Sequence, residues 1–466
     1  MQLLYLYELK TIKTNQLNTV MKYEDKLTNV TVMGAAGKMG SGILYLTATE
    51  MARQKFLPAN KKRHFVLYAL DTSHEALSGL LSYIRTQAWK FAEKNIVSLR
   101  KVYNDRTDLI DNEDIIRQYA HDVLSFIRPV TRIESAFESN VIFEAVSENP
   151  ELKIQLMSTI NKNNKNLPWF FTNTSAIPIS FLDEQANLDG RIMGVHFYNP
   201  PAVQKLIEVV KTESTRPELS YFVNDFIKNV GKTYVWAYDV AGFIGNGYFM
   251  RDILFAEQLV KNLQEQEEFS YTESLYMINK ISQDFLIRPM GIFQLVDYVG
   301  IDVVQFIMSV MNPHILKEDI HSRLIDSHLH NGIKGGQFAD GRQKDGFFKY
   351  EEGSLKAVFD PGKKRYIDIS EFSETCDEHL GNLPSKWLPW KKMIRHPEKN
   401  DLLRMYFNQL KELKNPGARI AWQYVQKFKE IGNNLVKEKV ALRFDDVNAV
   451  LINGFHHAYG PVNDYF

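Results

Sequence analysis

The sequence of 466 residues is poor in cysteine and carries no excess of either charge. Its single cysteine, Cys376, excludes a disulfide within the chain and a cysteine cage around a metal, and it fits a reducing compartment. The 56 lysine and arginine residues are balanced by 56 aspartate and glutamate residues, so no overall basic field attracts nucleic acid or anionic lipid. We therefore expect neither a secreted protein nor a nucleic-acid-binding protein.

Long hydrophobic runs are also missing. No stretch reaches the roughly 18 apolar residues that a membrane-spanning helix needs, and the apolar run at the start is too short for a secretory signal. We expect a cytoplasmic protein that does not bind membranes. Hydrophobic residues make up 44% and charged residues 24%, which is the composition of a globular chain with a sizeable core. The length suggests about three compact units.

Residues 29–240 alternate between short apolar runs, typical of buried strands, and amphipathic stretches, typical of helices. The strand-like runs are Asn29–Met33, His64–Leu70, Val141–Val146, Trp169–Thr174, Arg191–Phe197 and Leu206–Val210. Such alternation predicts a largely parallel sheet whose faces are covered by helices. Residues 1–28 show no clear period, and we expect them to form an N-terminal extension.

Strand-like runs disappear after about Asp239 and long helical periods replace them. The predicted helices are Asn246–Gln264, Thr272–Phe285 and Ile292–Met311. We expect residues 241–355 to form a helical domain and residues 356–466 a second helical module. A weak similarity between the segments that begin at Arg288 and at Gly454 suggests that the second module is a degenerate copy of the first.

A glycine-rich turn, Gly34-Ala-Ala-Gly37-Lys-Met-Gly40, joins the first predicted strand to the first predicted helix. Small residues allow a pyrophosphate to come close, and the helix N-terminus supplies N–H groups for it. The second strand run ends in Asp71, whose carboxylate can bind a ribose 2′-hydroxyl and would repel a 2′-phosphate. Either feature alone could be an ordinary turn or strand end. Together in a β-α-β unit they predict a Rossmann-type domain that binds NAD rather than NADP.

Six further blocks follow in a characteristic order. They are Val146-Ser-Glu148-Asn-Pro-Glu-Leu-Lys153, Asn173-Thr-Ser175, Gly194-Val-His196-Phe-Tyr-Asn199-Pro200, Lys205-Leu-Ile-Glu208-Val-Val, Gly242-Phe-Ile-Gly-Asn246 and Arg288-Pro-Met-Gly-Ile-Phe. With them the sequence resembles the L-3-hydroxyacyl-CoA dehydrogenases of fatty acid β-oxidation. The resemblance implies an α/β Rossmann-type domain followed by all-α C-terminal helical domains, and longer members of that family carry a second C-terminal module.

The resemblance also implies the chemistry. Oxidation of a secondary alcohol needs a base for the hydroxyl proton, a task that suits an imidazole near neutral pH. The resemblance makes His196 this base, Glu208 the carboxylate that orients its ring, and Ser175 and Asn246 the polar pair around the reacting oxygen. Without it, Glu208 could be a surface charge on an edge strand, Ser175 a loop cap and Asn246 the N-cap of a helix.

The remaining ligand-binding residues come from the same resemblance. The predicted cofactor-binding residues are Gly34, Ala36, Gly37, Lys38, Met39, Gly40, Asp71, Glu148, Lys153, Ser175, Asn199 and Arg342. The predicted substrate-binding residues are Lys94, Lys153, Ser175 and Asn246, with the two lysines on the CoA moiety. The sequence departs from the family where Gly247 replaces an arginine, where Arg342 replaces a cofactor-facing lysine, and in the spacing of the glycine turn.

The resemblance implies an enzyme that oxidises (3S)-3-hydroxyacyl-CoA to 3-oxoacyl-CoA with NAD, in fatty acid β-oxidation or butanoate metabolism. It also implies a homodimer formed through the first helical domain, although the second helical module could instead cover that surface within one chain. One alternative is a sugar-acid dehydrogenase similar to gulonate 3-dehydrogenase, and another is a cofactor-binding protein without turnover. No metal site is expected, because neither the His328-Leu-His330 pair nor the His456-His457 pair has the further ligands that a metal ion requires.

Overall fold

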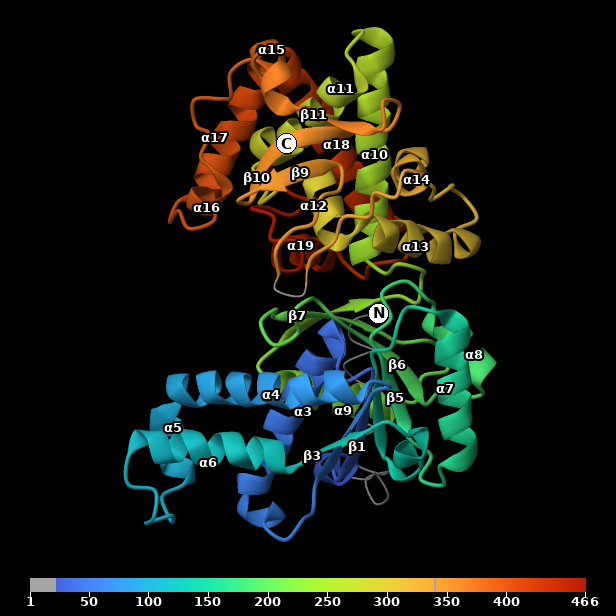
Figure 1. Cartoon of the computed structure of the whole chain (residues 1–466), viewed down its shortest axis with the longest axis vertical. Helices are drawn as coiled ribbons and strands as arrows, with labels where there is room; N and C mark the ends of the chain where they lie inside the picture. The colour runs from blue at the N-terminus through green and yellow to red at the C-terminus, as the bar shows by residue number, and fades with distance from the viewer. Residues whose placement is uncertain (1–21, 339–340) are drawn as a thin grey trace. The chain divides into compact units, whose positions relative to one another are not determined.

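The computed structural model describes residues 22–338 and 341–466 (Figure 1). The chain divides into two compact units. Unit 1 contains the described residues up to Thr174 together with Ile179–Tyr234, and unit 2 contains Ser175–Pro178 and Val235–Phe466. The division at Tyr234 lies close to the end of the predicted NAD-binding region.

A mostly parallel sheet forms the centre of unit 1. In the described part of the chain it has eight strands in the order β3-β2-β1-β4-β5-β6-β7-β8. Their bounds are β1 (Asn29–Met33), β2 (Val66–Leu70), β3 (Ile127–Val130), β4 (Val141–Glu144), β5 (Trp169–Thr172), β6 (Ile192–Phe197), β7 (Leu206–Val210) and β8 (Thr233–Ala237). Strands β1 to β6 pair in parallel, whereas β7 runs antiparallel to β6. The strand order reverses between β1 and β4, and ligands of such sheets bind at this switch point, beyond the carboxyl ends of the strands.

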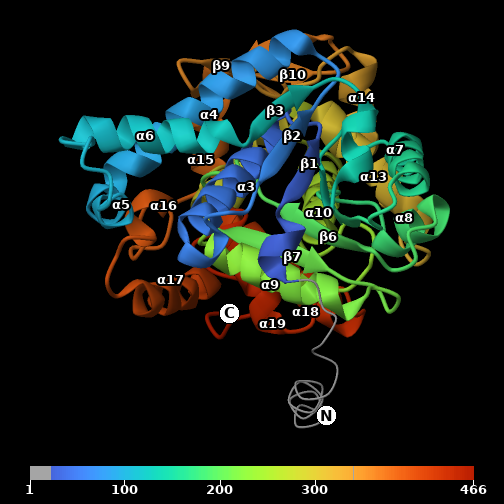
Figure 2. The same cartoon turned by 90° about the horizontal axis from the view of Figure 1, so that it is seen from below.

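Helices cover the sheet on both sides. They are α3 (Lys38–Phe56), α4 (His74–Lys94), α5 (Ile96–Val102), α6 (Asn112–Ser125), α7 (Pro150–Asn163), α8 (Ile179–Ala186) and α9 (Pro217–Asn229), with short 3-10 turns at η1 (Pro58–Asn60) and η2 (Ile133–Glu138). Figures 1 and 2 show α7 and α8 on the other side of the sheet from α4 and α6. Helix α4 begins where the sequence indicates, because Ser73 Oγ accepts a hydrogen bond from Ala76 N (3.1 Å). These layers confirm the predicted α/β fold of this region.

The predicted N-terminal extension is only partly described. Residues 1–21 lie outside the described residues, but the short helix α2 (Tyr23–Lys26) is part of unit 1. The Tyr23 hydroxyl donates to Glu50 (2.9 Å), and Lys26 Nζ lies 3.9 Å from the centre of the Trp169 ring. The sequence shows no sign of this helix, because one helical turn is too short to show a period. The boundary of the extension at residue 28 stays a prediction.

Unit 2 is mostly helical, as predicted. Its helices are α10 (Gly245–Gln266), α11 (Tyr271–Lys280), the π-helical turn η3 (Ile281–Phe285), α12 (Ile292–Val299), α13 (Ile301–Met311), η4 (Asn312–His314), α14 (Arg323–His330), η5 (Ile369–Glu371), α15 (Ser373–Leu380), α16 (Trp390–Met393), α17 (Lys399–Glu412), α18 (Pro416–Lys437) and α19 (Phe444–Asn453). The helix predicted at Ile292–Met311 is two helices, since Gly300 between them has a φ of 111°.

The described residues contain no single helix long and apolar enough to cross a membrane. Helices α12 and α13, extended to His314, pass that test of length and composition only as a pair, and the pair is bent by 91°.

A small sheet interrupts the helices of unit 2. Strands β9 (Phe348–Glu351), β10 (Ser354–Asp360) and β11 (Arg365–Asp368) pair antiparallel in the order β11-β10-β9. The prediction of a purely helical region is wrong here. The two-residue turn Glu352-Gly353, with positive φ at both residues, is a β-hairpin signal that the long helical periods on either side obscured.

The two predicted helical modules are packed together within unit 2. The predicted boundary between residues 355 and 356 falls inside β10. The Tyr406 hydroxyl donates to Phe285 O (2.7 Å) and the Tyr459 hydroxyl to Leu286 O (2.8 Å), so the end of the chain is tied to the segment just before Arg288. The two segments whose sequences are similar thus meet in space, and their origin by duplication stays a prediction.

One of the histidines weighed as a metal ligand is a core residue. His328 is buried, its Nδ1 lies 2.9 Å from Leu324 O, and its ring centre lies 4.1 Å from that of Phe347. Burial lowers the pKa of His328 to about 4. Among the described residues, no group of three or more His, Cys, Asp or Glu side chains is arranged to hold a metal ion.

Unit 2 should lose stability in acid because of His328. Between the unfolded pKa of 6.5 and the folded pKa of about 4, the unfolded chain binds a proton that the native core does not, so stability falls as the pH is lowered. The loss should reach up to about 3 kcal/mol from this residue alone. Urea unfolding between pH 4.5 and 7 should show a smaller pH dependence for His328→Leu than for the wild type. The exposed His330 provides the control His330→Gln, and equal slopes for wild type and His328→Leu would refute the expectation.

Candidate active site

The glycine-rich turn lies at the switch point of the sheet, after β1. Gly34 has a φ of +71°, and a side-chain carbon there would lie 2.5 Å from Ala145 O. A side-chain carbon at Gly40 would lie 2.0 Å from Gly34 O, so both positions require glycine. Gly37 precedes the first turn of α3. The turn thus forms a cradle without side chains at a helix N-terminus, which fits the pyrophosphate of a dinucleotide.

Asp71 lies beside this turn, as the NAD interpretation requires. It follows β2, and its Oδ2 accepts a hydrogen bond from Ala36 N (2.9 Å) while its Oδ1 accepts one from Thr72 N (2.8 Å). The turn and the carboxylate are therefore in contact, although they are far apart in sequence. Lys38 and Met39 form the start of α3.

A buried ionic cluster lies beyond the carboxyl end of β4. Lys153, on α7, is 1% exposed, and its Nζ lies 2.7 Å from Glu144 Oε1 and 3.2 Å from Glu148 Oε2. Thr172 donates a hydrogen bond to Glu144, and Thr174 donates one to Glu148. Burial on its own lowers the pKa of Lys153, but the charges and hydrogen bonds of the two glutamates outweigh it, so this pKa is raised.

The cluster shows what sequence reasoning missed. Glu148 and Lys153 were predicted, and the structure brings them together, but Lys153 is turned toward carboxylates inside unit 1 instead of lying on a solvated helix face. Glu144 was not predicted. The sequence did contain a signal for it, namely a single acidic residue at the end of an apolar strand. A carboxylate buried in this way needs a partner, so a lysine nearby in the chain could have been expected to pair with it.

Removing the cation from this cluster should destabilise unit 1. Lys153→Met leaves Glu144 buried and without its counter-charge, and breaking such a pair costs about 3–5 kcal/mol. Chemical unfolding should show this loss, whereas Lys162→Met, at an exposed position of the same helix, should change stability little. Adding Glu144→Gln to Lys153→Met should recover part of the loss. A stability of Lys153→Met within about 1 kcal/mol of the wild type would contradict the role of the pair.

A histidine and a glutamate face each other across β6 and β7. The antiparallel register places His196 directly opposite Glu208, and His196 Nδ1 lies 3.3 Å from Glu208 Oε1. The Glu208 side chain is 0% exposed and that of His196 is 12% exposed. The structure thus brings together the two residues predicted as base and orienting carboxylate, with the carboxylate fully buried.

Tyr198 is a third member of this group that sequence reasoning did not identify. Its hydroxyl donates to Glu208 Oε1 at 2.6 Å, and its ring centre lies 5.2 Å from that of His196. Burial, and secondarily the charge of Glu208, raises the pKa of Tyr198 well above its ordinary value, so the phenol stays protonated. The signal in the sequence was its position two residues after His196, because alternate residues of an extended segment share a face. Asn173, at the end of β5, accepts a hydrogen bond from Phe197 N (2.8 Å).

Ser175 and Asn246 both belong to unit 2 and are in contact there. Asn246 Nδ2 donates to Ser175 O (3.1 Å), and Gly242 N donates to Ala176 O (3.1 Å). Asn246 is not the N-cap of its helix, because α10 begins at Gly245 and its N-cap residue is Ile244. The alternative that its amide serves only as a helix cap is therefore wrong.

The structure places the remaining predicted residues as follows. Lys94 is the exposed last residue of α4, a helix of 21 residues that starts near Asp71, so Lys94 lies about 30 Å along the helix from its first residue. Asn199 is exposed just after β6. In unit 2, Arg342 O accepts a hydrogen bond from Phe338 N (2.9 Å), and the Arg342 guanidinium lies 5.3 Å from the centre of the Phe338 ring.

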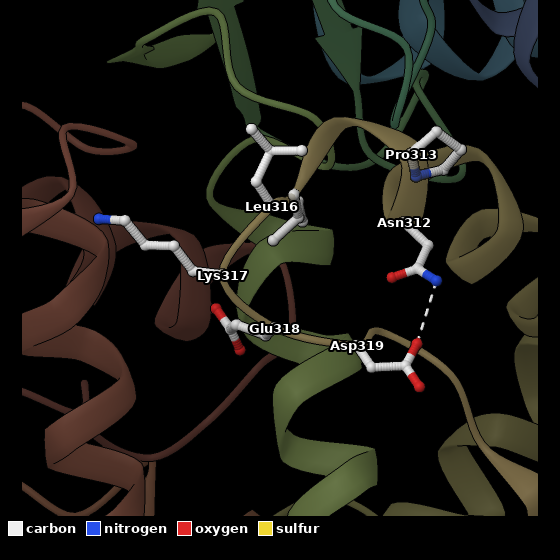
Figure 3. Close-up of a pocket in the computed structure, with 7 residues that line it drawn as sticks. Asn312, Pro313, Leu316, Lys317, Glu318 and Asp319 are labelled. Atoms are coloured by element: carbon white, nitrogen blue, oxygen red, sulfur yellow. Dashed lines mark hydrogen bonds between the residues drawn. The ribbon is translucent and has the colours of Figure 1, made fainter.

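A surface depression of about 580 Å³ lies in the loop that follows α13 (Figure 3). It is lined by Asn312, Pro313, Ile315, Leu316, Lys317, Glu318 and Asp319. Asn312 Nδ2 donates to Asp319 Oδ1 (3.0 Å), the bond drawn in Figure 3, and Glu318 is paired with Arg251. None of the predicted site residues lines it, so we place the chemistry at His196 and not here.

Comparisons with known proteins identify similar sequences. The family described as 3-hydroxyacyl-CoA dehydrogenase, NAD binding domain, matches residues 29–240. The mitochondrial hydroxyacyl-coenzyme A dehydrogenase of Sus scrofa is 30% identical over 261 residues, which are 54% of this chain and 77% of that protein. A probable 3-hydroxybutyryl-CoA dehydrogenase of Bacillus subtilis is 27% identical over 327 residues, 69% of this chain and 97% of that protein.

A solved structure is similar over nearly the whole chain. The crystal structure of 3-hydroxybutyryl-CoA dehydrogenase from Escherichia coli K12 covers 94% of this chain and 90% of its own, with a TM-score of 0.59 and 20% identity. At this identity the likeness concerns the fold alone, including its helical C-terminal region.

Proposed function

Because the chain belongs to the 3-hydroxyacyl-CoA dehydrogenase family, a family of NAD-dependent oxidoreductases, we propose that it oxidises (3S)-3-hydroxyacyl-CoA to 3-oxoacyl-CoA. The observation that carries the proposal is the pairing of His196 with the buried Glu208. This pairing argues against the alternative in which Glu208 is a solvated charge on an edge strand, because the Glu208 side chain is fully buried.

The geometry supports two different roles for the two side chains: Glu208 orients the ring of His196, and His196 acts as the base. The Glu208 carboxylate accepts a hydrogen bond from the Nδ1–H of His196, which fixes the ring and its tautomer. Nε2 is then the nitrogen that removes the proton of the substrate hydroxyl, and Glu208 stabilises the imidazolium that forms. The glycine cradle and Asp71 would hold the pyrophosphate and the ribose of NAD⁺, and the bound cofactor would supply the hydride acceptor.

The finer parts of the proposal go beyond the geometry of His196 and Glu208. We propose that Ser175 and Asn246 bind the reacting oxygen, and that Glu148, oriented by Lys153 and Thr174, contributes to cofactor binding. We also propose a cytoplasmic homodimer that acts in fatty acid β-oxidation or butanoate metabolism. The family of the relatives supports an acyl-CoA substrate.

Loss of the base should abolish most of the activity. With acetoacetyl-CoA or a longer 3-oxoacyl-CoA and NADH, His196→Gln should lower kcat/KM by roughly a thousandfold, the scale for removal of a general base. NADH affinity and thermal stability should stay near the wild-type values, and the exposed His330→Gln variant should retain full activity. A folded wild-type protein that binds NADH but turns over no acyl-CoA would contradict the proposal and would direct the next assays to sugar acids.

Coenzyme choice should depend on Asp71. The wild type should prefer NAD over NADP, and Asp71→Ser should lower the NAD/NADP ratio of kcat/KM by roughly ten- to a hundredfold, the value of a hydrogen bond to a charged group. Asp108→Ser, at an exposed carboxylate paired with Arg106, serves as the control and should leave the ratio unchanged. An unchanged ratio in Asp71→Ser would mean that Asp71 does not touch the ribose.

A further inference from the structure

Two donors share one oxygen of the buried Glu208. The Tyr198 hydroxyl lies 2.6 Å from Oε1, whereas His196 Nδ1 lies 3.3 Å from the same atom. The pairing of β6 with β7 sets this geometry, because it places Glu208 opposite His196 and leaves Tyr198, two residues on, beside the same carboxylate. The phenol therefore makes the shorter bond.

We propose that Tyr198 is a positioning residue that competes with His196 for Glu208 and thereby weakens the hold of the carboxylate on the protonated imidazole. The inference rests on the proposed function only in naming His196 as the base. The competition itself concerns three side chains of unit 1 and needs neither cofactor nor substrate.

The length of the bond explains why the competition matters. A donor–acceptor distance of 2.6 Å is in the range of charge-assisted O–H···O⁻ bonds, which are about twice as strong as neutral ones. A carboxylate that already accepts such a bond has part of its charge stabilised, so it stabilises a neighbouring imidazolium less. In a water-excluded site this effect is not screened, and Glu208 is completely buried.

The weaker stabilisation of protonated His196 favours a base that can both accept a proton and release it. His196 must be neutral to take the proton of the alcohol, and it must release that proton to return to its starting state. A carboxylate with no other donor would stabilise the protonated ring and slow that release. The Tyr198 phenol stays protonated as the pH rises. It therefore reduces the stabilisation of protonated His196 by Glu208 at every pH at which the enzyme would work.

The three side chains come from two neighbouring, antiparallel strands. Strand β6 and the residues after it supply His196 and Tyr198, and β7 supplies Glu208. The neighbouring strand β5 ends in Asn173, whose neutral amide accepts a hydrogen bond from Phe197 N. The effect of Tyr198 on His196 is therefore tested by removing the Tyr198 hydroxyl.

The test is an NMR titration of the whole chain labelled with ¹³C at histidine Cε1. The His196 signal is identified by its absence from His196→Gln. In Tyr198→Phe, the midpoint of the His196 titration should rise by roughly 0.5–1 pH unit, because Glu208 then no longer shares its charge with the phenol. Tyr23→Phe is the matched control, since the Tyr23 hydroxyl also donates to a carboxylate of unit 1, that of Glu50 (2.9 Å). It should leave the midpoint unmoved.

Two further measurements keep the proposal open to refutation. In the Glu208→Gln background, Tyr198→Phe should no longer move the midpoint, because the shared carboxylate is gone. If Tyr198→Phe fails to fold, 3,5-difluorotyrosine at position 198 keeps the ring, makes the phenol a stronger donor, and should move the midpoint down. An unmoved midpoint, or a shift opposite to that expected, would overturn the proposal.

Kinetics separates this proposal from the proposed function. The acid limb of the pH profile of kcat/KM should move up in Tyr198→Phe by the same amount as the NMR midpoint. If the midpoint moves but the wild type turns over no 3-oxoacyl-CoA, the competition for Glu208 stands and the proposed function fails. If the wild type is active but the midpoint does not move, the proposed function stands and the role of Tyr198 fails.

Discussion

The proposed chemistry depends on the antiparallel register between β6 and β7. That pairing sets Glu208 opposite His196 and buries the carboxylate in the sheet. A shift of one residue would turn Glu208 to the other face and leave an uncompensated charge in the core, a loss that no local adjustment could repair. The reversal from parallel pairing at β5–β6 to antiparallel pairing at β6–β7 is therefore a requirement of the site as well as a feature of the fold.

Two buried carboxylates in the sheet of unit 1 are stabilised in a similar way. Glu144 ends β4 and is held by Lys153 and Thr172, while Glu208 lies within β7 and is held by His196 and Tyr198. In both places a strand supplies the acid, and side chains from other positions bind it. The partners differ in a way that matters for function: the lysine supplies a counter-charge, whereas an imidazole can act as a general base.

The sequence allowed most of unit 1 to be predicted because its signals are local. The strand at Asn29–Met33 has the predicted bounds, and the cap at Ser73 depends on residues within one turn of it. Two features of unit 1 depend on contacts between different elements and escaped prediction: the burial of Lys153 and the position of Tyr198 beside Glu208. The sheet of unit 2 that begins at Phe348 escaped for another reason, because long helical periods flank its hairpin turn. A sequence read on its own shows which residues can share a face, but strand register decides which of them meet.

Tyr198 and Lys153 both donate to a buried carboxylate, but they affect its function differently, because one is neutral and the other is charged. A permanent cation locks its carboxylate in place, which suits Glu144 as a support for Glu148 at the end of β4. A carboxylate that serves a base must not hold the protonated form too tightly, because the ring has to give its proton up again. A neutral phenol satisfies part of the buried charge without competing for that proton. The short Tyr198–Glu208 bond thus has two effects on Glu208. It stabilises part of the buried negative charge, and it weakens the stabilisation of protonated His196, so that the ring can release its proton.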